Sequence, residues 1–177
     1  MGENIRGFQS GPDVGPIYAG GMVFDESTDA IYLTGSTYGR FGTPGNKPFE
    51  ASSCYLGILK LPNMQWQERG TFGVSNVPQA CNSLVLKNQE GKRTAFVIGS
   101  TEQGGLLSNL GSNNQAVQIG FVAELVNNKG ELKLSGGVIM DASKVQYPIS
   151  IHAAKGNDED FFIASMFSTK EVTPDYK

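Results

Sequence analysis

The chain repeats itself at a nearly constant interval, and this regularity constrains the fold more than any other feature. Residues 18–38 align without a gap with residues 147–167, and a third copy lies between them at residues 79–104. Gly35, Gly99 and Ala164 occupy equivalent positions in the three copies and are almost evenly spaced along the chain. Self-similarity at a fixed period predicts stacked or radial supersecondary units.

The composition fits an all-β domain of ordinary size. The 177 residues include 23 glycines and 8 prolines, which suit many short strands joined by turns. A hydrophobic content of 39% is enough for one core. We predict a flexible N-terminal segment over residues 1–15 and a single β-repeat domain over residues 16–177. Its units would span about residues 16–75, 76–143 and 144–177.

Charge and hydropathy exclude some classes of partner. The net charge is −3 with both signs interspersed, whereas a nucleic-acid partner requires a basic face. No stretch approaches the roughly 18 consecutive apolar residues of a membrane span. The segment 1–15 contains no hydrophobic region of a signal peptide, and the chain has no Asn-x-Ser/Thr sequon. The compartment therefore stays open: the protein would be secreted or at the cell surface if an upstream signal segment is missing, and cytoplasmic otherwise.

Each unit is predicted to contain two strand pairs. The residues Asp25–Asp29 favour a tight turn between the first two strands. The second pairs of the first two units align without a gap when Tyr55 is placed on Phe121, which puts Trp66 in the place of Leu132. The predicted strands cover residues 21–24, 30–34, 53–61, 65–72, 95–98, 120–126 and 131–139, with a further pair within 149–164.

Four antiparallel strands in each repeated unit describe a β-propeller. The chain resembles the β-propeller repeat family of the seven-bladed type, whose inner strand reads Tyr-x-Thr-Gly-Ser-Thr. The matching residues of the first unit are Tyr32, Thr34, Gly35, Ser36 and Thr37. The second unit keeps Phe96, Gly99, Ser100 and Thr101, and the third keeps Phe162 and Ser165. The resemblance covers about two and a half units and implies a propeller-like fold.

The chain departs from that family in two respects. Its period is longer than the ~40–50 residues common for propeller units. The additional residues lie at 38–52 and 103–118, which are rich in Gly, Asn, Ser and Pro and are predicted to form long surface loops. A propeller also needs about four blades to close. We therefore expect an incomplete ring.

The two long loops are the predicted recognition surface, because loops on a rigid scaffold often carry binding residues. In the first loop Tyr38 and Phe41 lie beside Arg40, outside the alternating pattern of the strands. In the second loop the candidate ligand-binding residues are Glu102, Gln103 and Asn109. A protein or a carbohydrate would fit such a surface.

Other chemically capable residues have simpler structural interpretations. The acidic stretch 156–160 lacks the ligand spacing of a calcium loop and aligns with a plain hairpin turn. His152 is the only histidine and lies in a predicted strand opposite Val23, which favours a core or edge position over a catalytic one. Cys54 and Cys81 open two strands of neighbouring units and could form a disulfide or stay free. We predict no catalytic residue, no metal site and no cofactor.

Three functions remain open. The favoured one is a non-catalytic propeller-type binding or scaffold module, which recognises a partner through its long inter-strand loops. The second is a self-assembling structural protein whose copies join through open sheet edges as a homo-oligomer. The third is a fragment of a propeller hydrolase whose catalytic residues would lie outside this sequence.

Overall fold

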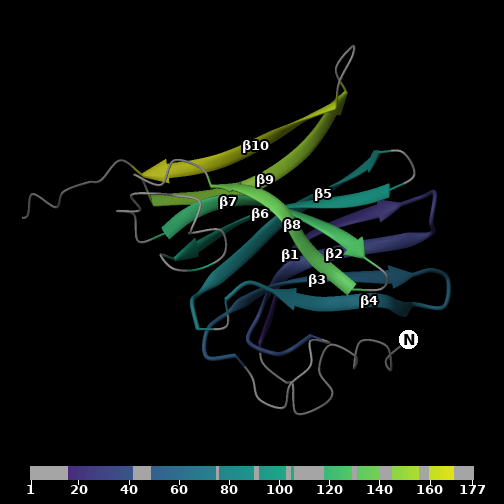
Figure 1. Ribbon diagram of the computed structural model, residues 1–177, viewed down its shortest axis with the longest axis horizontal. Helices are drawn as coiled ribbons and strands as arrows, with labels where there is room; N and C mark the ends of the chain where they lie inside the picture. Colours follow the sequence, from purple (N-terminus) through teal and green to yellow (C-terminus); the bar gives the residue numbers. More distant parts are fainter. Residues whose placement is uncertain are drawn as a thin grey trace, which may run out of the picture.

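The computed structural model describes residues 16–41, 49–74, 76–89, 92–102, 105, 118–128, 131–139, 145–155 and 160–169. Every regular element in these ranges is a β-strand (Figure 1). The strands are β1 (Ile17–Asp25), β2 (Ala30–Thr37), β3 (Ser53–Lys60), β4 (Gln65–Phe72), β5 (Gln79–Gln89), β6 (Lys92–Glu102), β7 (Gln118–Asn128), β8 (Glu131–Ile139), β9 (Val145–Lys155) and β10 (Asp160–Thr169). Within the described ranges, no helix is long and apolar enough to cross a membrane.

The strands form three antiparallel sheets in chain order. Sheet A has the order β1-β2-β3-β4, sheet B has the order β5-β6-β7-β8, and sheet C contains β9 and β10. None of the sheets closes on itself (Figure 1). The prediction of an all-β chain with four-stranded antiparallel units is confirmed for sheets A and B.

The turn between β1 and β2 has the chemistry expected of a hairpin turn. The carboxylate of Asp25 accepts hydrogen bonds from the Ser27 N–H at 3.1 Å, the Ser27 hydroxyl at 3.2 Å and the Thr28 hydroxyl at 2.6 Å. Asp29 completes this turn with a φ of 53°, a left-handed conformation that aspartate tolerates. The predicted turn at Asp25–Asp29 is therefore present between β1 and β2.

Two glycines of the repeated motif are explained by close backbone approach. A Cβ atom on Gly35 would lie 2.1 Å from the carbonyl oxygen of Tyr18 in β1. A Cβ atom on Gly99 would lie 2.2 Å from the equivalent carbonyl oxygen of Ala80 in β5. Both distances are far below van der Waals contact, so only glycine fits where the second strand of each hairpin passes the first.

The first strand of each sheet carries a β-bulge at a corresponding place. In β1 the residues Gly20 and Gly21 lie opposite Thr34 alone. Asn82 is the extra residue in β5, and Ile149 is the extra residue in β9. A bulge increases the local twist of a strand. All three sheets are therefore twisted at the same point of their first strand.

Hairpin length changes one expected equivalence. Trp66 pairs with Leu59 in sheet A, and Leu134 pairs with Leu125 in sheet B. Leu59 and Leu125 are equivalent in the alignment that places Tyr55 on Phe121, so Trp66 corresponds to Leu134 and not to Leu132. The reason is that eight residues separate Leu125 from Leu134, whereas six separate Leu59 from Trp66, so the β7–β8 hairpin is two residues longer between the equivalent positions.

The three sheets stack face to face and bury two cores. The first core lies between sheets A and B and includes Leu56 and Ile58 of β3 with Leu84 of β5 and Phe121 of β7. The second core contains Val85 and Ile98 of sheet B with Ile151 of sheet C. Strand β5 contacts β1 and β2 on one side and β9 on the other. Sheet B is therefore covered on both faces.

Covalent and polar links fasten sheet A to sheet B. Cys54 of β3 and Cys81 of β5 form a disulfide whose Cα atoms are 5.5 Å apart, and both residues are buried. The buried Gln79 side chain donates to the carbonyl oxygens of Val74 and Val77, both at 2.7 Å, and accepts from the Val74 N–H at 3.1 Å. These bonds fix the segment that leads from β4 into β5.

Candidate functional site

The long connection after β2 is closed at its base by backbone hydrogen bonds. The Tyr38 N–H donates to the carbonyl oxygen of Pro16 at 3.2 Å, and the Phe49 N–H donates to the carbonyl oxygen of Tyr38 at 2.7 Å. The guanidinium carbon of Arg40 lies 4.5 Å from the centre of the Phe49 ring, a cation–π distance. Tyr38 and Arg40 are half-buried at this end of sheet A.

Phe41 does not present its ring for recognition. It is 7% exposed, and its ring centre lies 4.5 Å from that of Tyr55 and 5.4 Å from that of Trp66. Gly57 leaves the space for this packing, because a Cβ atom there would lie 2.6 Å from the Trp66 ring. The expectation of an accessible Phe41 is thus corrected. Burying the aromatic ring on the outer face of β3 and β4 is more favourable in free energy than leaving it exposed to solvent.

Glu102 is the predicted residue of the second loop that the structure describes. It is exposed at the end of β6, where its N–H donates to the carbonyl oxygen of Pro78 at 3.2 Å. Gln103 and Asn109 lie outside the described residues. Glu102 borders a hollow of about 120 Å³, whose other lining residues are Ser52, Pro78, Gln79, Ala80, Ser100, Thr101 and Gln118.

This hollow lies at the loop-bearing end of sheets A and B. Gln118 at the start of β7 donates from Nε2 to the Ser100 hydroxyl at 2.8 Å. The Ser52 hydroxyl, at the end of the first long connection, donates to the carbonyl oxygen of Gln79 at 3.0 Å. The hollow therefore joins the bases of both long connections, and its lining offers hydroxyl, amide and carboxylate groups.

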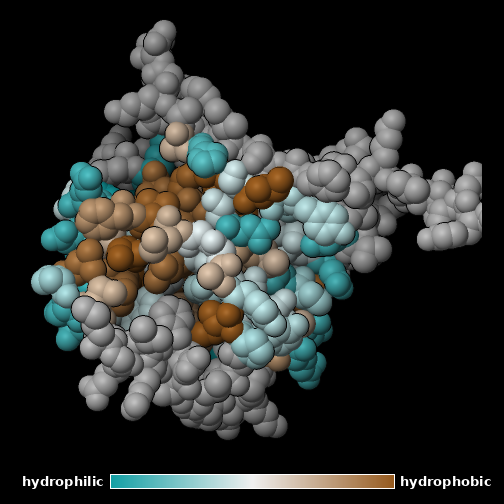
Figure 2. Space-filling model, turned by 180° about the vertical axis from the view of Figure 1, so that it is seen from behind, coloured by the Kyte–Doolittle hydropathy of each residue, from teal (hydrophilic) through white to brown (hydrophobic). Residues whose placement is uncertain are grey.

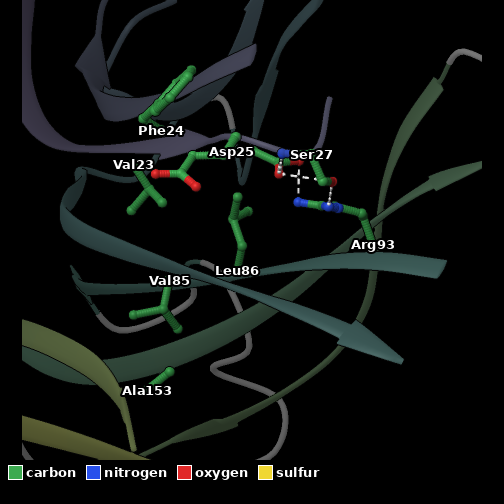
Figure 3. A pocket seen from close by; sticks show the side chains of 9 residues that line it. Val23, Phe24, Asp25, Ser27, Val85, Leu86, Arg93 and Ala153 are labelled. Carbon is green, nitrogen blue, oxygen red and sulfur yellow. Dashed lines mark hydrogen bonds and ion pairs between the residues drawn. The ribbon is translucent and has the colours of Figure 1, made fainter. Parts of the chain in front are cut away.

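A second hollow lies at the opposite end, where the hairpin turns are (Figure 3). It measures about 440 Å³ and is lined by Val23, Phe24, Asp25, Glu26, Ser27, Val85, Leu86, Arg93 and Ala153. Figure 3 shows Val23 and Leu86 on its apolar side, with Arg93 reaching toward Asp25 and Ser27. The lining comes from all three sheets, so this hollow marks where their first strands meet.

An ion pair links sheets A and B at the edge of the second hollow. Arg93 of β6 pairs with the Asp25 carboxylate and donates to the Ser27 hydroxyl. The Asp25 side chain is 4% exposed and that of Arg93 is 21% exposed. Sequence reasoning missed this pair, because the two residues belong to different units of the repeat and share no local pattern.

The pKa of Asp25 reflects opposing causes. Burial raises the pKa of the carboxyl group, but hydrogen bonds from Thr28 and Arg93 and the charge of Arg93 outweigh burial. The net pKa lies below the ordinary value of an aspartate. The folded state therefore favours the ionised form, which ties stability to pH.

We expect Asp25→Asn to lower the free energy of unfolding at pH 7 by roughly 2 kcal/mol, since it removes hydrogen bonds to a charged group. Because the folded pKa is depressed, the Asp25 contribution is fully present above the unfolded pKa of about 4. It is lost as the pH falls through the folded pKa. Urea unfolding from pH 3 to pH 7 should show the difference from wild type shrinking at the acidic end. Asp29→Asn, in the same turn, is the control, and a pH-independent difference would contradict the assignment.

Other titratable groups lie between sheets A and B. Burial raises the pKa of Glu68 in β4 and of Tyr32 in β2, and the nearby Asp25 and Glu68 raise that of Tyr32 further. A buried carboxyl group with a raised pKa is the kind of group that acid–base catalysis uses. However, Glu68 lines neither of the two hollows described above.

His152 is exposed in β9, with Nε2 3.2 Å from the Ser150 hydroxyl. Its neighbour Ile151 is buried against sheet B, so His152 points to the free face of sheet C. Of the acidic stretch, only Asp160 lies within the described ranges, where it begins β10. In the part of the chain that the structure describes, no three His, Cys, Asp or Glu side chains gather closely enough to hold a metal.

Comparisons with known proteins add no relative. No family model matches the chain, and neither does any curated protein or solved structure at a significant level.

Proposed function

We propose that the chain is a non-catalytic binding module of the β-propeller type. Its recognition surface would be the end of sheets A and B from which the two long connections emerge. This proposal depends on the stacking of consecutive antiparallel sheets. The first strand of sheet B contacts β1 and β2 of sheet A on one side and the first strand of sheet C on the other. A propeller consists of four-stranded sheets arranged in this way around an axis.

The two ends of the sheets differ in character, which supports placing recognition at the loop-bearing end. At the opposite end the strands of sheet A join through short turns, and Asp25, Ser27 and Arg93 are engaged with one another. At the loop-bearing end, the exposed Glu102 borders the smaller hollow, and the half-buried Tyr38 and Arg40 lie in the first long connection. Rigid strands with polar groups on longer connections are the usual arrangement of a binding surface.

The experiment that tests this function probes the 177-residue chain against an immobilised glycan array and a phage-displayed peptide library. A binding module should select ligands from one of these two probes. The double variant Tyr38→Ala/Glu102→Ala should weaken the selected binding on the order of tenfold, the loss of one or two good polar contacts. Asn63→Ala, an exposed change at the opposite end, should leave binding unchanged. Failure of both probes, or equal losses in both variants, would overturn the proposal.

A further inference from the structure

The outer face of sheet A, turned away from sheet B, is apolar and exposed near β1. Met22 is 67% exposed and Phe24 is 49% exposed. The register places Leu33 of β2 beside Met22, and Ile31 beside Phe24, so these four side chains form one patch. Figure 2, which views the molecule from behind, shows apolar side chains gathered over the region of β1 and β2. We call these four residues the outer patch.

The corresponding positions of sheet B are covered by a neighbouring sheet. Counted along the ladders from the glycines Gly35 and Gly99, Met22 and Phe24 correspond to Leu84 and Leu86. Leu33 and Ile31 correspond to Val97 and Ala95. Leu84, Val97 and Ala95 are 3%, 0% and 4% exposed, because sheet A covers them. The same rungs are thus buried in sheet B and uncovered in sheet A.

The face of sheet A that covers these rungs of sheet B has a counterpart in sheet C. Val23 of sheet A packs against the same core as Leu86, and both line the hairpin-end hollow (Figure 3). Val23 follows the bulge of β1 by the same interval as His152 follows the bulge of β9. His152 therefore occupies on the free face of sheet C the place that Val23 occupies on sheet A.

We infer that the outer patch of one copy binds the free face of sheet C in a second copy. A two-fold pair of such contacts joins twice the three sheets of one chain into a ring of six, of which four sheets are four-stranded and the two copies of sheet C are two-stranded. A ring of this size lies within the four to eight blades of known propellers. Within each contact Phe24 would face the partner's His152, as Leu86 faces Val23 inside one chain. This inference rests on the proposed propeller-type arrangement. It adds a second copy of the chain as the partner that would close the ring of sheets.

Light scattering across a dilution series tests the dimer. The intact chain should show a mass near twice 18.9 kDa at high concentration and dissociate on dilution. Met22→Glu should raise the dissociation constant more than tenfold, because it would bury an unpaired charge. Met64→Glu is the matched control, a methionine 40% exposed in the β3–β4 turn, and should leave the mass unchanged. A monomer at every concentration, or a dimer that Met22→Glu does not weaken, would overturn the inference.

A charge pair tests the register of the contact. Phe24→Lys and His152→Glu should each be monomeric, and the two together in one chain should restore the dimer. Far-UV circular dichroism of each variant distinguishes a lost contact from a lost fold. If both single variants stay dimeric, or if the double variant stays monomeric while folded, the proposed register is wrong. Glycan and peptide binding by the monomeric variants reports on the loop-bearing end separately, so failure of the dimer and failure of the binding function are distinguishable.

Discussion

Replacing Cys54 and Cys81 together by alanine is expected to lower the free energy of unfolding by about 3.5 kcal/mol. The disulfide closes a loop with a sequence separation of 27, and the chain-entropy relation gives a stabilisation of this size for such a loop. Both residues are buried in the core between sheets A and B, so the bond also links these two sheets covalently. Urea unfolding with linear extrapolation measures the change.

The control for this prediction uses the unmodified chain. Unfolding in the presence of a reducing agent should reproduce most of the loss, whereas the alanine variant should not respond to the reductant. If reduction lowers the free energy of unfolding of the wild-type chain by less than about 1 kcal/mol, the disulfide is not a stabilising link between the sheets.

Phe121→Ala is expected to cost about 3–5 kcal/mol, the range for removing a fully buried aromatic ring. Phe121 is 0% exposed and is the largest fully buried side chain among the described residues. Its ring lies against Gly99, where a Cβ atom would be 2.7 Å from the Phe121 Cζ, so Gly99 has no side chain that could move into the space the ring would leave. The cavity would therefore open directly between sheets A and B.

Val138→Ala on β8 is the matched control for this cavity. Val138 is 64% exposed, and the loss of its methyl groups should change the free energy of unfolding by no more than ~0.5 kcal/mol. If Phe121→Ala costs as little as this control, sheets A and B do not form a close-packed core.

Much of the strand order is predictable because it depends on local chemistry. The residues Asp25–Asp29 form the expected turn, since the aspartate carboxylate can accept hydrogen bonds from Ser27 and Thr28 only when the chain reverses there. The predicted strand 65–72 matches β4, and the predicted strand 131–139 matches β8. Alternating polarity and turn residues carry this information within a few positions of each other.

The features that sequence reasoning missed or predicted wrongly depend on contacts between distant residues. Phe41 lies outside any strand pattern, which predicts an accessible ring. In the structure its ring packs on the sheet, because Gly57 leaves space for it beside Trp66. The Asp25–Arg93 pair joins residues of two sheets, and no residue spacing within either hairpin predicts it. A gapless alignment gives Trp66 the wrong counterpart in sheet B, because the β7–β8 hairpin has two more residues between the equivalent positions than the β3–β4 hairpin.

The stacking of the three sheets is the central claim, and methyl nuclear Overhauser spectra of the intact chain test it most directly. We predict cross-peaks from Leu56 or Ile58 of sheet A to Leu84 or Leu125 of sheet B, and from Ile151 of sheet C to Val85 or Ile98 of sheet B, because these residues share the two cores. Retained amide contacts within each sheet, together with missing methyl cross-peaks between the sheets, would contradict the stack.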